Sequence, residues 1–327
     1  MRISPITPDA FCRSIEKALD NPPDVNHSIK RIQNTLNRLP EGKLIVSNQG
    51  KRVVFFTVIN GKQKYLSKKS DIIHPLARRR YQTMLLEILK LTHSTRKYDH
   101  QRRKDLIVRL QQFIHTCVKG NLDITKIVLT SSQYAWFTGK FWQKSIDKTT
   151  ALMTNRNIPV RSKSERDILN GCDSFAIPFH YEERMTINVK YLVDKLEKTL
   201  LRKGFINHPE ELYTYIAGEI HWNVPQELQW MNAYGSVWRT YYPPKGTIEI
   251  YNDIKGMFAD GSIFIWEHEG LITEFGYRCH ALERAAVMKI TNAIEKNHLI
   301  ETYERDVDAP EKVIDIIERE ILPRLWF

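Results

Sequence analysis

The 327-residue sequence has no apolar run approaching the roughly 18 residues that a membrane-spanning helix needs. The start of the sequence, residues 1–5, lacks the apolar core of a secretory signal peptide. Only four cysteines are present, Cys12, Cys117, Cys172 and Cys279, and they are too scattered for a zinc or redox motif. We therefore expect a reduced, cytoplasmic protein with free thiols and no membrane partner.

Repeats, low-complexity segments and familiar histidine motifs are also missing. None of the 11 histidines has metalloprotease spacing such as H-E-x-x-H. The composition is 42% hydrophobic, which at this length is enough for a sizeable core. We expect two modules, or one large domain with additions.

Charge is distributed unevenly along the chain. Residues 1–150 carry 28 Lys and Arg against 11 Asp and Glu, a net charge of +17. Residues 151–327 carry 21 and 27, a net charge of −6, and the whole chain is at +11. Such asymmetry is typical of a basic region that meets a polyanion, so we expect a nucleic-acid partner. The alternative for any single basic run is a solvated surface.

Residues 1–150 are predicted to form a basic, mostly helical region that contains a β-meander. Helices are expected at 8–19, 29–39, 72–91 and 95–118, where apolar residues recur at helical spacing. Between them, strands are expected at 44–46, 53–58 and 64–66, with Asn60-Gly61 as the strongest turn signal. Residues 120–160 contain many aromatic residues and are expected to be an irregular linker.

The candidate nucleic-acid-binding residues lie in this region. They are Lys62, Lys64, Lys68 and Lys69, on or directly after the last strand of the β-meander, and Arg78, Arg79, Arg80, Arg102 and Arg103 on the helices. We call the part of the meander that carries these four lysines the ribbon. A basic ribbon suits a phosphate backbone. It equally suits a strand edge whose lysines block aggregation.

From residue 160 the pattern becomes mixed α/β. A helix is expected at 162–172 and strands at 179–187, 248–254, 262–268 and 299–304. A further helix is expected at 281–296 and a final one from Pro310. Residues 190–246 are interpreted as an insertion, helical at its start. Without it, the order is α-β-β-β-α-β followed by one more helix.

Acidic residues interrupt the two strands of the predicted hairpin. Asp253 ends one strand, and Glu267 lies near it on the next, with Glu269 on the same face as Glu267. Neighbouring carboxylates repel one another unless a cation lies between them, and their oxygens suit Mg²⁺ or Mn²⁺. A turn residue and an exposed strand residue would be the structural alternative.

These residues, in this order of elements, resemble the PD-(D/E)XK signature of restriction-endonuclease-like nucleases. More closely, the chain resembles an uncharacterised Firmicute protein family with a nuclease-like C-terminal domain. The resemblance rests on short stretches in the same order. They are residues 61–66 (GKQKYL), 161–165 (RSKSE), 251–253 (YND), 266–268 (WEH) and 289–290 (KI).

The resemblance implies Asp253 and Glu267 as metal ligands, with Glu165 as an accessory acidic residue. Two departures occur: Asn252 stands in the usual proline position, and Glu269 stands where lysine is usual. Lys289 is therefore the candidate that would supply the missing ammonium group. Glu165 also fits a helix-capping box, S-x-x-E from Ser162, and that role would involve no chemistry. Lys289 would otherwise be a surface residue.

The sequence thus predicts a two-part protein. Residues 1–150 would bind the nucleic-acid backbone, and an α/β nuclease-like domain at 160–327 would hydrolyse phosphodiester bonds with Mg²⁺ or Mn²⁺. DNA rather than RNA is the expected substrate, by analogy with the fold class alone. A binding protein that keeps the fold without cleaving is one alternative, and a structural protein that binds an acidic partner is another.

Overall fold

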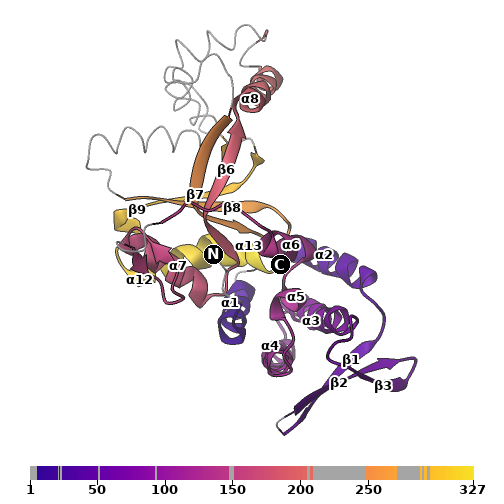
Figure 1. The fold of residues 1–327 in the computed structure, drawn as a ribbon. Helices are drawn as coiled ribbons and strands as arrows, with labels where there is room; N and C mark the ends of the chain where they lie inside the picture. Colours follow the sequence, from indigo (N-terminus) through magenta and orange to yellow (C-terminus); the bar gives the residue numbers. More distant parts are fainter. Residues whose placement is uncertain are drawn as a thin grey trace.

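A computed structural model describes residues 6–20, 22, 24–50, 52–92, 94–146, 151–204, 207–208, 247–270, 288, 291–292 and 295–327. Over these residues the protein is a mixed α/β structure with several sheets. Figure 1 shows the four-stranded sheet β6–β9 above a layer of helices, with the small sheet β1–β3 at the far end of that layer. The predicted fold class is confirmed at this level.

Four helices form most of the N-terminal region, as predicted. They are α1 (Pro8–Asp20), α2 (Val25–Arg38), α3 (Ile73–Lys90) and α4 (Lys97–Lys119). Each has an apolar stripe at helical spacing; the buried hydrophobic residues of α3 are Ile73, Leu76, Ala77, Tyr81, Leu85, Ile88 and Leu89. These stripes face one another, because α3 packs against both α2 and α4.

The predicted β-meander is present as an antiparallel sheet. Its strands are β1 (Lys43–Gln49), β2 (Arg52–Ile59) and β3 (Lys62–Leu66), in that spatial order. The turn between β2 and β3 has φ values of +50° at Asn60 and +74° at Gly61. Both positions of this two-residue turn therefore lie in the left-handed region, which explains the Asn-Gly pair.

The segment from 120 to 160 is more regular than the sequence predicted. It contains the short helices α5 (Ile124–Val128) and α6 (Ser131–Thr138), so the expectation of an irregular linker was wrong there. A capping box between Thr130 and Gln133 starts α6. The Gln133 amide also donates to the backbone oxygens of Met257, at 2.9 Å, and Leu325, at 3.0 Å. It thereby ties α6 to the C-terminal half of the chain.

The C-terminal half begins with a two-stranded sheet and a helix. Strands β4 (Leu152–Met153) and β5 (Pro159–Val160) pair, and α7 (Lys163–Ser174) follows as predicted. Within the predicted insertion at 190–246, the structure describes α8 (Val189–Lys203) and residues 204 and 207–208. Most of that insertion lies outside the described residues.

The main sheet has the spatial order β6-β7-β8-β9. Its strands are β6 (Phe179–Asn188), β7 (Thr247–Met257), β8 (Ile263–Glu269) and β9 (His298–Tyr303). The first three are antiparallel neighbours, whereas β9 runs parallel to β8. A parallel pair needs a crossover connection. The helix predicted there, at 281–296, lies largely outside the described residues.

The chain ends in a nearly continuous helical stretch. After the 3₁₀ turn η2 (Glu304–Asp306) come α12 (Pro310–Ile316), the π-helical turn η3 (Ile317–Ile321) and α13 (Leu322–Leu325). Helix α12 lies close to α7, and a Cβ atom on Gly171 would be 2.8 Å from Cγ1 of Val313. Only glycine permits this close approach of the two helices.

One hydrophobic core cluster contains residues from both halves of the chain. Helix α13 packs against α1, and the Trp326 indole donates a 2.8 Å hydrogen bond to the buried Ser14 hydroxyl. The division into 1–150 and 160–327 stays a prediction. The shared core joins these two parts of the chain. No helix of the described residues is long and apolar enough to cross a membrane.

Candidate metal centre

Asp253 and Glu267 lie where strands β7 and β8 separate. The paired register of the two strands ends at Ile254 opposite Trp266, so Asp253 and Glu267 occupy the next positions. The Glu267 carboxylate accepts from the backbone N–H of Asp253 at 3.2 Å, and the Asp253 carboxylate accepts from that of His268 at 2.8 Å. Both side chains are buried, each residue being 4% exposed. The carboxylates thus satisfy backbone donors that the interrupted ladder would otherwise leave unpaired.

Glu182 faces Asp253 from the other side, on β6. Its neighbours Tyr181 and Glu183 pair with Ile254 and Asn252, which puts Glu182 opposite Asp253. The residue is 1% exposed and has φ +53°, a left-handed conformation that is strained for a glutamate. Its carbonyl accepts from the backbone N–H of Lys144 at 3.2 Å, outside the main sheet. Strain of this kind is concentrated at functional sites.

Glu165 enters the same site from the first turn of α7. The predicted capping box is present: Ser162 accepts from the Glu165 backbone, and the Glu165 carboxylate accepts from that of Ser162. The same carboxylate oxygen accepts from the backbone N–H of Arg161 at 2.9 Å and from the Tyr181 hydroxyl at 2.8 Å. Glu165 is therefore a cap residue whose carboxylate also reaches the strands.

Three carboxylates converge at this point. Glu165, Glu182 and Asp253 each offer an oxygen atom that lies within 4.8 Å of the other two. The pKa of Glu182 is raised to about 7: burial is the largest cause, Arg161 opposes the rise, and the nearby Asp253 and Glu165 add smaller increases. Three clustered carboxylates form a donor set that suits a hard divalent cation such as Mg²⁺ or Mn²⁺.

The cation present in the cluster is the guanidinium of Arg161. Its Nη2 contacts the carboxylate of Glu182, and it lies 3.4 Å from Glu165 Oε1 and 3.7 Å from Asp253 Oδ1. Burial alone would lower the pKa of Arg161, but the surrounding carboxylates outweigh it and raise the pKa above its ordinary value. The Arg161 side chain is 40% exposed, so the site is open to solvent on the side of this residue.

The predicted site residues are only partly brought together. Asp253 and Glu165 meet in the cluster, and Glu267 lies beside Asp253 but is not one of the three converging residues. Glu269, opposite Tyr303 of β9, lies two residues further along β8. Lys289 lies outside the described residues. The sequence analysis did not identify Glu182. Only the pairing of β6 with β7 places this residue opposite Asp253.

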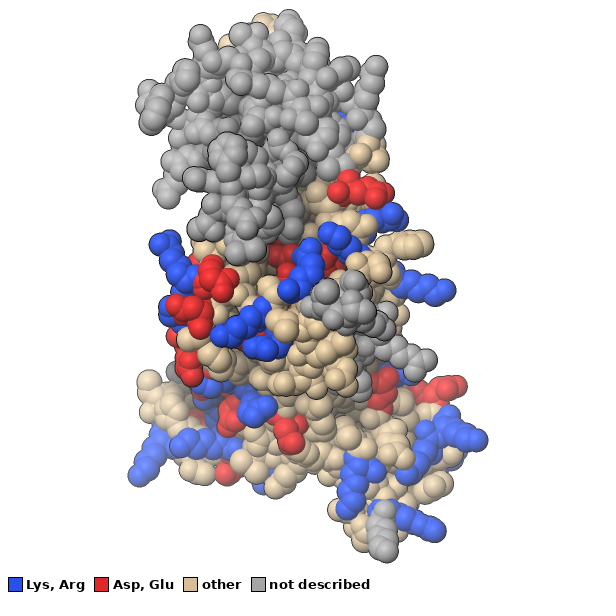
Figure 2. Space-filling view, turned by 60° about the vertical axis from the view of Figure 1, so that its left-hand side comes forward, with Lys and Arg blue, Asp and Glu red and all other residues tan. Residues whose placement is uncertain are grey.

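The basic residues of the N-terminal region fall into two groups. The exposed group is Lys62, Lys64, Lys68, Lys69 and Arg102. The other group contacts the protein itself: Arg78 donates to Ser131, Arg79 to the carbonyls of Leu36 and Leu39, Arg80 to that of Leu44, and Arg103 to that of Leu19. Figure 2 shows Lys and Arg side chains projecting from the lowest part of the molecule, where Figure 1 places β1–β3 and α4. The exposed group therefore contains the better candidates for contact with a polyanion.

The site thus combines two buried carboxylates, the partly buried Glu165, a competing guanidinium and a strained backbone, with exposed lysines on separate elements of the chain. Its chemistry has to be inferred from this geometry. Comparisons of the chain with protein-family models, with curated proteins and with solved structures found no match.

Proposed function

We propose that the protein is a metal-dependent nuclease that hydrolyses phosphodiester bonds. The observation that carries the proposal is the convergence of Glu165, Glu182 and Asp253 within 4.8 Å of one another in a partly open, acidic site. The order α7, β6, β7, β8 and β9, interrupted by α8 in the predicted insertion and with β9 parallel to β8, supports a restriction-endonuclease-like αβββαβ core, whose second helix, expected at 281–296, lies largely outside the described residues. A cleavage assay with Mg²⁺, Mn²⁺ or EDTA, on DNA and RNA substrates, tests the activity.

In this proposal Glu165, Glu182 and Asp253 hold the cation. When bound, Mg²⁺ or Mn²⁺ activates water and neutralises negative charge at the phosphate. The protein orients the ligands through neighbouring groups: the Tyr181 hydroxyl holds Glu165, and the His268 backbone N–H holds Asp253. Glu267 holds the backbone of Asp253 in turn. These hydrogen bonds fix ligand positions as outer partners do in metal sites.

The substrate contact proposed for the basic region rests on the exposed ribbon. Lys62 and Lys64 lie on β3, and Lys68 and Lys69 follow it, all with exposed side chains. Exposed lysines attract a phosphate backbone without reading its sequence. DNA is the proposed nucleic acid only by analogy with the fold class.

A second candidate function is nucleic-acid binding without cleavage. The observation in its favour is Arg161, whose guanidinium already compensates the charge of the three carboxylates. In that case the cluster would be a structural ion-pair network. A basic surface that binds an acidic protein instead would differ from both in its weaker dependence on salt.

The two roles of Glu165 can be separated by a pair of substitutions. Glu165→Gln keeps a side chain that suits the capping box but removes the charge, so we expect cleavage to fall with little change in melting temperature. Ser162→Ala removes the cap and keeps the carboxylate. It should lower the free energy of unfolding by about 0.5–2 kcal/mol and largely preserve cleavage. Thermal unfolding and the cleavage rate are measured for both variants.

The opposite pattern would assign Glu165 to the helix cap alone. Glu165→Gln would then cleave at the wild-type rate. A loss of cleavage in Ser162→Ala alone would mean that the cap, rather than the charge of Glu165, maintains the site.

Replacing the four ribbon lysines Lys62, Lys64, Lys68 and Lys69 by glutamine should weaken nucleic-acid binding. Each lost phosphate contact reduces the slope of log K against log salt by about 0.9, so we expect a reduction of up to about 3–4. Fluorescence polarisation of a labelled DNA duplex over a salt series measures the slope.

The matched control removes four exposed lysines from other parts of the chain. These are Lys30, Lys140, Lys190 and Lys312. The control has the same net charge as the ribbon variant, so it separates a local contact from general attraction. Equal slopes for the two variants would show that the ribbon is only a solvated edge.

A further inference from the structure

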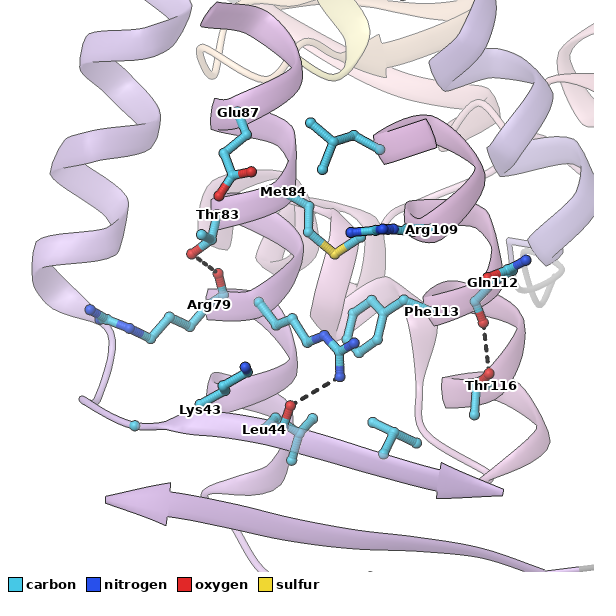
Figure 3. Close-up of a pocket in the computed structure, with 14 residues that line it drawn as sticks. Lys43, Leu44, Arg79, Thr83, Met84, Glu87, Arg109, Gln112, Phe113 and Thr116 are labelled. Atoms are coloured by element: carbon cyan, nitrogen blue, oxygen red, sulfur yellow. Dashed lines mark hydrogen bonds between the residues drawn. The ribbon is translucent and has the colours of Figure 1, made fainter. Parts of the chain in front are cut away.

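A second site candidate lies away from the main sheet, between β1 and helices α3 and α4. The cavity has a volume of about 700 Å³, within the range of small-molecule sites. Figure 3 shows Leu44 of β1 at its base, Met84 of α3 on one wall and Phe113 of α4 on the other. Three separate elements therefore shape a concave site whose lining is partly apolar.

Two unpaired cations flank this cavity. The exposed side chains of Lys43, at the start of β1, and Arg109, on α4, have no hydrogen-bond or ion-pair partner among the described residues. Figure 3 shows both side chains directed toward the space between the elements, whereas the side chain of Arg79 points away from it. Glu87 is the one acidic residue among the described residues of the lining. The described lining therefore carries four cations, Lys43, Arg79, Arg80 and Arg109, against one carboxylate.

The inner wall presents a flat surface beside these cations. The Arg80 guanidinium lies 4.6 Å from the ring centroid of Phe113 and donates to the Leu44 carbonyl at 3.0 Å. Both contacts hold the Arg80 group in place, and Phe113 is only 4% exposed. Met84 adds a polarisable side chain next to them. A guanidinium plane is one of the surfaces on which nucleobases stack.

We propose that this cavity binds a phosphorylated nucleotide. Lys43 and Arg109 bind the phosphate, and the base lies against Met84 and the Arg80 guanidinium, because the Phe113 ring is buried beneath that guanidinium. The nucleotide is either a free monophosphate or the phosphorylated end of a nucleic-acid strand, since both present the same group. This proposal does not depend on the metal cluster, which lies on different elements of the chain.

Isothermal titration calorimetry with AMP, adenosine and inorganic phosphate tests the proposal on the full chain. AMP should bind, and adenosine and inorganic phosphate should each bind at least about tenfold more weakly, because each lacks one of the two contacts. The double variant Lys43→Gln/Arg109→Gln should lose about tenfold or more in AMP affinity. Thr83→Phe, at the exposed rim, should also weaken binding by filling the space while keeping every charge.

The matched control is Lys30→Gln/Lys104→Gln. It removes two exposed cations from α2 and α4, outside the lining of the cavity, and should bind AMP within about twofold of the wild type. Absence of AMP binding to the wild type would overturn the proposal. So would equal losses in the two double variants, or inorganic phosphate binding as tightly as AMP.

Oligonucleotides then distinguish the two sources of the ligand. Preference for a 5′-phosphorylated strand over its 5′-hydroxyl form, lost in Lys43→Gln/Arg109→Gln, assigns the cavity to a strand end. Binding of AMP with no such preference assigns it to a free nucleotide. Asp253→Asn should change neither the affinity for AMP nor the preference for a 5′-phosphorylated strand. A failure of the nuclease proposal can therefore be distinguished from a failure of this one.

Discussion

Replacing Asp253 by asparagine should lower metal-dependent cleavage by about a thousandfold or more, equivalent to about 4 kcal/mol of transition-state stabilisation. Asp253 is the carboxylate at the centre of the site, because it lies opposite Glu182, within reach of Glu165 and beside Glu267. Asparagine has nearly the same shape and keeps an oxygen for the His268 N–H, so the fold should be retained. The cleavage rate is measured with Mg²⁺ and with Mn²⁺.

Nucleic-acid binding by the same variant should stay near the wild-type level, because the exposed ribbon lysines lie on other elements. Glu249→Gln is the matched control: Glu249 lies on the same strand, is half exposed and pairs with Arg184, away from the cluster. It should cleave normally. If the wild-type protein binds DNA but does not cut it with either metal, the nuclease proposal is wrong and nucleic-acid binding remains as the function.

The sequence was sufficient for the parts of the site that depend on local signals. Asp253 and Glu267 are joined by a short hairpin, so their proximity follows from strand pairing within one continuous segment. Ser162 and Glu165 form an S-x-x-E motif, which fixed the start of α7. The same reasoning should have found α6, whose Thr130-x-x-Gln133 motif is another capping box.

Glu182 was missed because its partner is distant in the sequence. Its position opposite Asp253 depends on the register of β6 with β7, two strands separated by a long segment. Its left-handed backbone has no sequence signal either, since glutamate is not a residue that favours positive φ. Non-local pairing of this kind is the information that periodicity in a single sequence does not contain.

The arginine run at 78–80 shows a different limit. Consecutive residues on a helix point in directions about 100° apart, so three adjacent arginines cannot share one face. In the structure they reach three different places, namely Ser131, the end of α2 and the Leu44 carbonyl. The sequence gives the charge of such a run, but the packing around the helix decides which side chains remain available to a ligand.

Arg161→Ala should make the stability of the protein strongly dependent on metal. Without metal, Glu165, Glu182 and Asp253 lose the guanidinium that compensates them, and we expect a loss of about 1–3 kcal/mol. The effect should be largest at alkaline pH, because the pKa of Glu182, about 7 in the wild type, rises further when the guanidinium that lowers it is removed. Because the folded pKa of Glu182 is raised, the native variant takes up a proton as the pH falls through that pKa, and the loss of stability diminishes. Denaturant unfolding measures the change in the presence of EDTA.

Mn²⁺ should restore most of that stability, because the cation binds the folded cluster that Arg161 has vacated. It should stabilise the variant more than the wild type, in which the guanidinium competes for the same oxygens. Arg156→Ala is the matched control, because Arg156 pairs with the largely buried Asp173 at 3.4 Å. Loss of this ion pair should destabilise the protein, and Mn²⁺ should stabilise this variant no more than the wild type. If Mn²⁺ stabilises Arg161→Ala no more than the wild type, the three carboxylates form a structural network around Arg161. Nucleic-acid binding without cleavage would then replace the nuclease proposal.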